Sequence, residues 1–258
     1  EILIGLVGSE MCIRDRSWDL DFAGRFQKDT ANFKDMVAYL DKKVGRMIDR
    51  LKRNGQWENT IFIFTSDNGT STRIVSQMSD GTLRRGGKGD PRGIGTSVPL
   101  IICWGDKLEP RESQRLVDFT DFFPTFADAM RIAVPEEYGL DGVSLFPEIV
   151  GEKPLEKEIS LMHYNPLWPV AAAPYASRAA RTTEWKYYWD GRFYNTKTDF
   201  MEEHPIDIDT CSNEIKTIYA KLKAKVEECP NFYPDMPGAP RRGNYGTFYD
   251  FAEPNNPF

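Results

Sequence analysis

Two short, continuous apolar runs constrain the fold of this chain more than any other feature. Thr60–Thr65 (TIFIFT) and Val98–Trp104 (VPLIICW) are rich in β-branched and aromatic residues, and such runs are typical of strands buried on both faces of a parallel sheet. From Asp29 to Asn54 apolar residues recur at steps of three and four, which predicts an amphipathic helix that ends at Gly55. Leu116–Met130 is also expected to be helical. Helix, strand, glycine-rich loop, strand and helix in this order predict an α/β fold.

The sequence changes in character after about residue 150. Trp185–Tyr194 places aromatic segments around an Asp-Gly turn, which is typical of a β-hairpin. Asn213–Cys229 carries apolar residues at helical spacing. We therefore expect part of an α/β domain at 17–150, followed at 151–258 by a small subdomain with an antiparallel sheet, a helix and an irregular tail.

Composition excludes several functional classes. The 258 residues carry a net charge of −6 and contain 40% hydrophobic and 28% charged residues, which describes a globular chain rather than a disordered one. No apolar run approaches the roughly 18 residues of a membrane span, and an acidic chain without a basic block is a poor candidate for a nucleic-acid binder. Two histidines and four cysteines without CxxC spacing do not indicate a zinc site.

The first candidate site residues directly follow the first apolar run. Ser66-Asp67-Asn68-Gly69 stands at the carboxyl end of the predicted strand, which is where open α/β sheets place their ligands. The carboxylate of Asp67 and the amide oxygen of Asn68 are hard oxygen ligands that suit Ca²⁺. Taken alone, the motif is more typical of an ordinary turn.

The second candidate is Lys88, within Leu83–Gly89 (LRRGGKG). A lysine between glycines can approach an anion closely, because no neighbouring Cβ obstructs the backbone. Its ammonium group can donate hydrogen bonds and a proton. Taken alone, this pattern is also typical of a solvated loop lysine.

The order of these segments along the chain is more informative than either motif alone. TIFIFTSDNGT, LRRGGKGD, GIGTSVPLIICW, DFTDFFPTFADAM and LDGVSLFPEIVGEK follow AYLDKKVGRMIDRLKRNGQWENT in that order, and WKYYWDGRFYNTKTDFMEEHP comes later. From roughly Asn32 to His204 the chain resembles the C-terminal half of the sulfatases, within the alkaline phosphatase superfamily. The acidic-proline turn usual in that family is replaced here by Thr198–Glu202.

The resemblance implies a fold and a chemistry. The fold would be part of an alkaline-phosphatase-like mixed or parallel sheet flanked by helices. Sulfatases hydrolyse aryl or carbohydrate sulfate esters at a Ca²⁺ site with a formylglycine nucleophile. Matched by motif, Asp67 and Asn68 would be two of the calcium ligands, and Lys88 would contact the sulfate and the leaving-group oxygen. Sulfatases of this type are commonly exported, so an extracytoplasmic location is expected.

The residue after Asp67 helps to separate the branches of the superfamily. Zinc-dependent phosphatase relatives typically have histidine there, whereas the neutral oxygen donor of Asn68 favours calcium and the sulfatase branch. Two alternatives stay open: a phosphonate or phosphodiester hydrolase of the same superfamily, and a non-catalytic binding chain.

The segment 1–16 (EILIGLVGSEMCIRDR) is expected to be a non-native junction peptide, because VGSEMCIRD resembles adapter-derived sequence joined to a coding fragment; an ordinary loop or strand end is the alternative. On this interpretation the chain begins midway through a larger enzyme, lacks the upstream formylglycine motif C-x-[P/A]-x-R, and is inactive by itself. Cys12 has an arginine at the right spacing but stands too close to Asp67 to be the nucleophile.

Several other residues are weaker candidates. Ser177–Arg181 fits the serine form of the nucleophile motif but lies on the wrong side of Asp67, and Arg178 and Arg181 are expected to be solvated strand residues rather than part of a substrate mouth. His163 is interpreted as structural, and Trp168 could shape a substrate wall. Cys211 and Cys229 could pair in an oxidising compartment or remain thiols.

Overall fold

The computed structural model describes residues 30–72, 74–164 and 177–229. This part of the chain forms two compact units, and each is discontinuous in sequence. Of the described residues, unit 1 comprises 30–72, 74–88, 97–112 and 120–154, and unit 2 comprises 89–96, 113–119, 155–164 and 177–229. Within the described residues, no helix combines the length and the apolar character that a membrane crossing requires.

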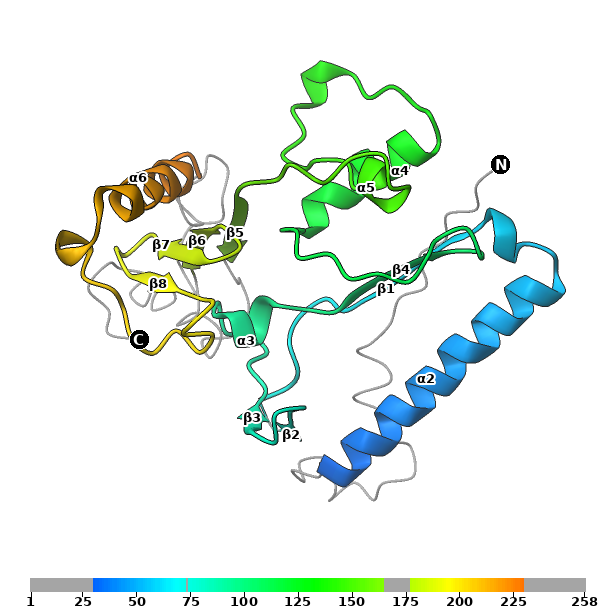
Figure 1. Cartoon of the computed structure of the whole chain (residues 1–258). Helices are drawn as coiled ribbons and strands as arrows, with labels where there is room; N and C mark the ends of the chain where they lie inside the picture. Colours follow the sequence, from blue (N-terminus) through cyan, green and yellow to red (C-terminus); the bar gives the residue numbers. More distant parts are fainter. Residues whose placement is uncertain (1–29, 73, 165–176, 230–258) are drawn as a thin grey trace, which may run out of the picture. The chain divides into compact units, whose positions relative to one another are not determined.

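The elements of unit 1 are labelled in Figure 1 and are α2 (Thr30–Arg53), η2 (Trp57–Asn59), β1 (Ile61–Thr65), β2 (Val75–Gln77), β3 (Leu83–Arg85), β4 (Leu100–Trp104), α4 (Phe122–Ala129), η4 (Glu136–Tyr138) and α5 (Phe146–Ile149), with η3 (Phe119–Asp121) at its edge. The predicted first helix is confirmed as α2. Its end is a Schellman motif, because Gly55 has a φ of 67° while its N–H donates to the Lys52 carbonyl and the Gln56 N–H to the Leu51 carbonyl.

The two predicted strands pair with each other, but not as expected. β1 and β4 are antiparallel, with Ile61 opposite Trp104 and Thr65 opposite Leu100. The expectation of strands buried on both faces of a parallel sheet is therefore wrong for the described residues: both strands are mostly half-buried, and Ile101 is 55% exposed. An apolar run indicates that a strand is buried. It does not indicate whether the neighbouring strand is parallel or antiparallel.

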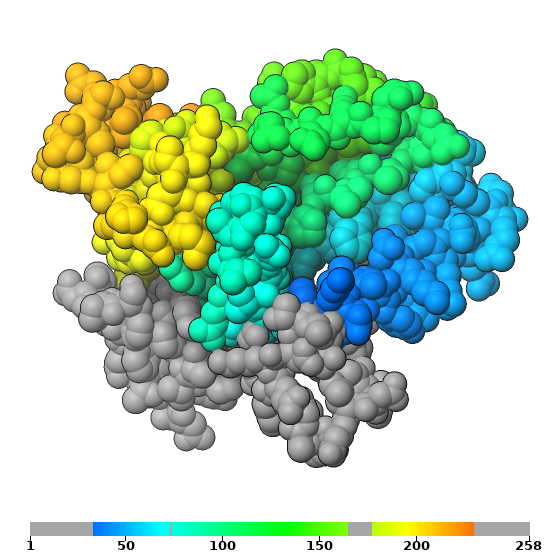
Figure 2. All heavy atoms as spheres, turned by 60° about the horizontal axis from the view of Figure 1, so that its bottom comes forward, coloured from blue at the N-terminus to red at the C-terminus, as the bar shows by residue number. Residues whose placement is uncertain are grey.

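The segment between β1 and β4 contains a β-hairpin that the sequence pattern did not predict. β2 and β3 pair antiparallel from Val75–Arg85 to Gln77–Leu83, and the turn is held by Asp80, whose carboxylate accepts from both the N–H and the hydroxyl of Thr82. Figure 2 shows this hairpin, in cyan to teal, at the molecular surface.

A buried aspartate organises the helical part of unit 1. Asp121 is fully buried, and its side chain accepts a hydrogen bond of 2.8 Å from the Val143 N–H. The Thr125 hydroxyl donates to the Asp121 carbonyl and accepts from the Leu145 N–H at 2.8 Å. The helix expected at 116–130 is shorter than predicted, since regular α-helix begins only at Phe122.

Unit 2 contains a four-stranded antiparallel sheet of β5 (Ser160–Tyr164), β6 (Ser177–Arg181), β7 (Trp185–Tyr188) and β8 (Phe193–Asn195), in that order, together with α3 (Gly93–Thr96), η6 (Ile208–Thr210) and α6 (Asn213–Glu227). Helix α6 lies across one face of the sheet (Figure 1). The core between them contains Ala180, Tyr187, Phe193, Leu222 and Val226. The predicted hairpin at 185–194 and the predicted helix at 213–229 are both confirmed.

Candidate active site

The loop after β1 carries the first two candidate residues. Asp67 is exposed and Asn68 is half-buried. The turn that presents them is fixed locally, because the Ser66 hydroxyl donates a hydrogen bond of 2.9 Å to the Asn68 carbonyl. Both side chains therefore belong to a short loop that begins directly at the end of a strand.

The chain returns to this loop after β3. The Gly86 N–H donates to the Ile74 carbonyl, and the Lys88 N–H donates to the Thr70 carbonyl, each at 2.9 Å. The guanidinium of Arg85 also donates to the Thr72 carbonyl. Lys88 is thus attached by its backbone to a residue two positions beyond Asn68, and its side chain is half-buried.

The close approach of the two loops requires glycine at position 86. A Cβ atom at this position would lie 2.3 Å from the carbonyl oxygens of both Thr70 and Ser71. Two carbonyls of one loop therefore occupy the space that a side chain would need. We call this arrangement of residues 66–72, 74 and 85–88 the loop cluster; it joins the loop of Asp67 and Asn68 to the loop of Lys88 through their backbones.

The loop cluster supplies two kinds of chemical group. Asp67 and Asn68 offer two oxygen donors, whereas Ca²⁺ takes about six to eight. Among the residues that the structure describes, no group of three or more His, Cys, Asp and Glu side chains is arranged to hold a metal. The donor set fits calcium in its chemistry but forms only part of a coordination shell, and Lys88 adds a cation suited to a sulfate or phosphate oxygen.

The weaker candidates of the C-terminal part are structural where they are described. Ser177 on β6 is buried. Arg178 lies 5.6 Å from the Trp189 ring centroid and contacts the Cys229 carbonyl, so the expectation of a solvated strand residue is wrong for it. Burial lowers the pKa of Arg181, whose side chain donates to the Thr182 carbonyl.

The remaining candidates are cysteines, a histidine and a tryptophan. No disulfide joins Cys211 to Cys229 in the described part of the chain. His163 lies opposite Arg178 in the β5–β6 register, and the pKa of its imidazole is lowered by burial and by the Arg178 charge. Cys12 and Trp168 lie outside the described residues.

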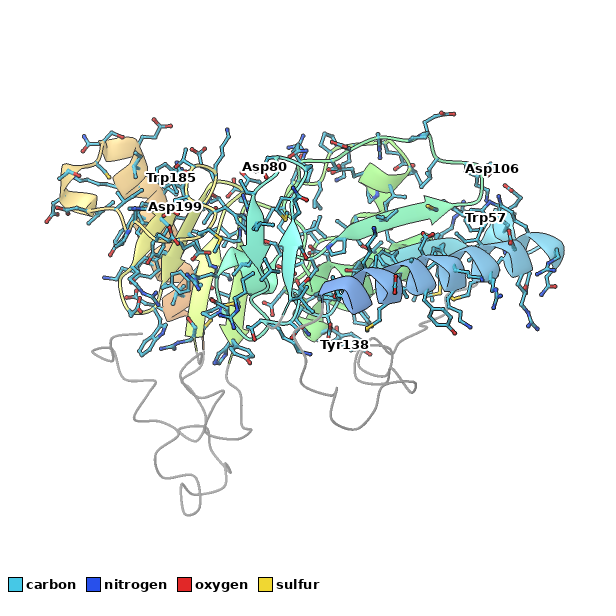
Figure 3. The ribbon with its side chains drawn as sticks, turned by 90° about the horizontal axis from the view of Figure 1, so that it is seen from below. Trp57, Asp80, Asp106, Tyr138, Trp185 and Asp199 are labelled. Atoms are coloured by element: carbon cyan, nitrogen blue, oxygen red, sulfur yellow. The ribbon has the colours of Figure 1, made fainter. Side chains whose placement is uncertain are left out.

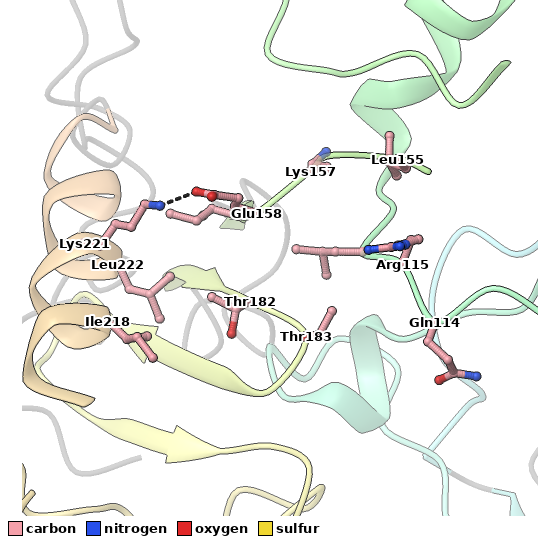
Figure 4. Close-up of a pocket in the computed structure, with 12 residues that line it drawn as sticks. Gln114, Arg115, Leu155, Lys157, Glu158, Thr182, Thr183, Ile218, Lys221 and Leu222 are labelled. Atoms are coloured by element: carbon pink, nitrogen blue, oxygen red, sulfur yellow. Dashed lines mark hydrogen bonds and ion pairs between the residues drawn. The ribbon is translucent and has the colours of Figure 1, made fainter. Parts of the chain in front are cut away.

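A pocket of about 450 Å³ lies in unit 2 (Figure 4). It is lined by residues from other segments of the chain than the candidate site residues. Its charged lining includes Arg115, Lys157, Lys221 and Glu158. Both lysines are engaged in ion pairs, Lys221 with Glu158 and Lys157 with Asp118 at 2.7 Å. Neither Asp67, Asn68 nor Lys88 lines this pocket.

Sequence reasoning missed one group of residues that surrounds the segment following Lys88. Lys186 and Tyr188 on β7 and Glu202 in the loop after β8 form a buried polar cluster. A signal was present in the sequence: Lys186 stands among aromatic residues in a strand whose neighbours are buried, so a charged residue there needed a buried partner.

Comparison with known proteins finds relatives over the part of the chain that contains the loop cluster. Residues 12–132 match the protein-family model for Sulfatase, a range that includes both loops. The chain is 37% identical over 137 residues to the uncharacterized sulfatase YdeN of Escherichia coli, and 28% identical over 146 residues to an N-acetylgalactosamine-6-O-sulfatase of Bacteroides thetaiotaomicron. Each of these matches covers 53% of this chain, but only 23% and 28% of the respective relatives.

Solved structures show a likeness of fold. The solved structure of Ps i-CgsB in complex with k-i-k-neocarrahexaose matches with a TM-score of 0.62 and 24% identity, over 89% of this chain and 49% of that chain. The mixed α/β architecture is the alkaline-phosphatase-like fold, as the sequence predicted. Over residues 12–132 the chain is thus similar to the sulfatases, by family model and by its relatives.

Proposed function

We propose that the protein carrying this chain hydrolyses sulfate esters, and that the loop cluster forms part of its active site. One observation carries the proposal: the Lys88 N–H donates to the Thr70 carbonyl, which joins the lysine loop to the Asp67–Asn68 loop. A cation and two hard oxygen donors thereby stand on two joined loops, in a sequence that matches the Sulfatase family model over residues 12–132.

Lys88 is proposed to act on the sulfate group. Its ammonium group can donate hydrogen bonds to sulfuryl oxygens, where negative charge increases in the transition state. When the bond between sulfur and the leaving-group oxygen breaks, the electron pair goes to that oxygen. Lys88 can supply the proton that this oxygen then needs, which is general acid catalysis.

Calcium is proposed as the metal of this site. Asp67 and Asn68 would hold it, because an aspartate carboxylate and an amide carbonyl are the oxygen donors that Ca²⁺ prefers. When bound, the ion would withdraw charge from the sulfuryl oxygens. The remaining ligands must come from residues other than these two.

A sulfated carbohydrate is the proposed substrate class. This part of the proposal is supported by the relative named N-acetylgalactosamine-6-O-sulfatase. Aryl sulfates contain the same ester group and are convenient probes of it.

The experiment measures hydrolysis of 4-nitrophenyl sulfate and N-acetylgalactosamine 6-sulfate by the protein that carries this sequence. Lys88→Ala should lower kcat/KM about 100-fold or more, as expected for loss of a group that stabilises transition-state charge. The matched control is Lys153→Ala, which removes an exposed lysine of the same unit and should leave kcat/KM unchanged.

Two outcomes would overturn parts of this proposal. Unchanged kinetics in Lys88→Ala would remove Lys88 from the site, and faster turnover of a phosphonate monoester than of either sulfate would favour the phosphonate hydrolase alternative. Calorimetric titration with Ca²⁺ tests the metal independently, since Asp67→Asn should weaken binding if Asp67 is a ligand.

A further inference from the structure

A buried polar cluster in unit 2 holds the segment that follows Lys88 in the chain. Lys186 and Glu202 are 2% and 5% exposed, and Tyr188 is fully buried. One oxygen of the Glu202 carboxylate accepts from Lys186 Nζ at 3.0 Å and from the Gly93 N–H at 2.8 Å. The other accepts from the Tyr188 hydroxyl at 2.5 Å. We call Lys186, Tyr188 and Glu202 the anchor cluster.

The anchor cluster binds backbone atoms of residues 91–93 from two sides. Lys186 Nζ donates to the Pro91 carbonyl at 2.7 Å, and the Tyr188 hydroxyl lies 3.3 Å from the same oxygen. Glu202 accepts a hydrogen bond from the Gly93 N–H. The anchor cluster is therefore hydrogen-bonded to both a carbonyl and an N–H of this short segment.

Neighbouring contacts hold the same segment and the loop that presents Glu202. Arg92 forms an ion pair with Asp90 at 2.6 Å and donates to the Met201 carbonyl at 3.3 Å. A Cβ at Gly93 would lie 3.2 Å from the Phe200 ring, so the segment and the ring are in close contact. Figure 3 labels Trp185, the first residue of β7, and Asp199, which belongs to the loop that presents Glu202.

The chemistry of the anchor cluster is unusual for a purely stabilising contact. Burial lowers the pKa of Lys186 to about 8 against the attraction of Glu202, and burial raises the pKa of Tyr188. Replacing a buried ion pair by apolar residues of similar volume is often neutral or stabilising. Glu202 also has a φ of 55°, a conformation that non-glycine residues seldom adopt. Hydrophobic packing could stabilise unit 2 with fewer constraints, but it could not bind a carbonyl and an N–H at defined positions.

The bound segment is adjacent to Lys88 in the chain. Asp90 is only two residues beyond Lys88, and the intervening Gly89 has a φ of 88°. On the preceding side, Lys88 is attached through its own N–H to Thr70. Along the chain, Lys88 therefore lies between two bonded segments: its own N–H is bonded to Thr70 within unit 1, and residues 91–93 are bonded to the anchor cluster within unit 2.

We propose that Lys186, Glu202 and Tyr188 are positioning residues for Lys88: they fix the backbone of residues 91–93 and thereby set where the Lys88 ammonium group acts. This inference rests on the proposed role of Lys88 in sulfate-ester hydrolysis. A small displacement of a reacting group can reduce turnover about 100-fold, so loss of the anchor cluster should impair catalysis without removing any group that touches the substrate.

A double-mutant cycle in the full protein tests the proposal, with 4-nitrophenyl sulfate as substrate. Lys186→Met should lower kcat/KM by about 10- to 100-fold in the wild-type background. In a Lys88→Ala background the same change should lower it less than about 2-fold, because there is no ammonium group left to position. Equal losses in the two backgrounds would overturn the proposal, since a general structural defect does not depend on Lys88.

The matched control is Lys157→Met. Lys157 is also a lysine of unit 2 with a side chain only 5% exposed and an acidic partner, Asp118, at 2.7 Å. Its loss should give the same kcat/KM change in both backgrounds. If Lys186→Met does not fold, as judged by near-ultraviolet circular dichroism, Tyr188→Phe replaces it in the cycle, because this change removes only the hydroxyl that contacts Glu202 and Pro91.

The leaving group provides a second readout. If Lys88 protonates the leaving oxygen, its misplacement should slow esters of weakly acidic alcohols more than 4-nitrophenyl sulfate. Lys186→Met should therefore share the steeper leaving-group dependence of Lys88→Ala, and an unchanged dependence would contradict the proposal. If Lys88→Ala itself leaves kcat/KM unchanged, the proposed function of Lys88 fails, which is a different outcome from equal losses in the two backgrounds.

Discussion

At Gly86 the absence of a side chain allows two loops of the candidate site to meet. Carbonyl oxygens of Thr70 and Ser71 lie 2.3 Å from the position of a Cβ atom, well inside van der Waals contact. Gly86→Ala must therefore displace one loop from the other. We expect it to lower the free energy of unfolding by about 1–3 kcal/mol and to impair sulfate-ester hydrolysis.

Gly45 provides the matched control for this prediction. It lies within α2, and a Cβ at this position would meet nothing within 4 Å. Gly45→Ala should be neutral or stabilise the protein by up to about 1 kcal/mol, because alanine favours helix more than glycine does. Thermal unfolding followed by circular dichroism measures both variants. If Gly86→Ala unfolds at the same temperature as the wild type, the close approach of the loops is wrong.

At the scale of elements, the β5–β6 pairing can be tested through one histidine. The register places His163 opposite Arg178, and burial together with the Arg178 charge lowers the pKa of His163 below its ordinary value. When the pH falls through the ordinary pKa of histidine, the unfolded chain binds a proton at this residue before the folded protein does. His163 should therefore make the free energy of unfolding fall as the solution is acidified through this range.

Nuclear magnetic resonance can follow this titration directly, because the chain has only two histidines. His204→Gln removes the other ring signal and assigns the one from His163. Arg178→Gln should raise the pKa of His163, whereas Arg178→Lys keeps the charge and should leave it low. A pKa of His163 that does not respond to Arg178→Gln would show that the Arg178 charge does not act on this imidazole.

Elements whose cause is local were the ones that the sequence could predict. The spacing of apolar residues and Gly55 define α2, and the Asp-Gly turn defines the hairpin of β7 and β8. The antiparallel pairing of β1 with β4 was not predictable, because an apolar run indicates burial and not strand direction.

In the candidate site, too, the sequence predicted local features but not the contacts between distant segments. Asp67, Asn68 and Lys88 were accessible to sequence reasoning because each stands in a short motif. The contacts that surround them were not, since Gly86 meets Thr70 across the β2–β3 hairpin, and Glu202 reaches Gly93 across 109 positions of sequence. No local pattern contains such a pairing.

The whole molecule is divided into units that the chain enters more than once, and this has a consequence for its stability. Residues 89–96 belong to unit 2 although the sequence on both sides of them belongs to unit 1. Their backbone is held by Lys186, Tyr188 and Glu202, on the same sheet and loop region that packs on α6. Loss of packing under α6 should therefore release a segment that lies more than 100 residues away in sequence.

Two leucine substitutions distinguish this prediction from general destabilisation. Leu222 is buried in the core of unit 2 and Leu145 is buried in unit 1, and replacement of either by alanine should cost about 2–5 kcal/mol. Under native conditions, brief trypsin treatment of Leu222→Ala should give early cleavage after Arg92, because local opening of unit 2 exposes that bond. Leu145→Ala should give cleavage within unit 1 first. Cleavage after Arg92 at equal rates in the two variants would show that residues 89–96 are not held by unit 2.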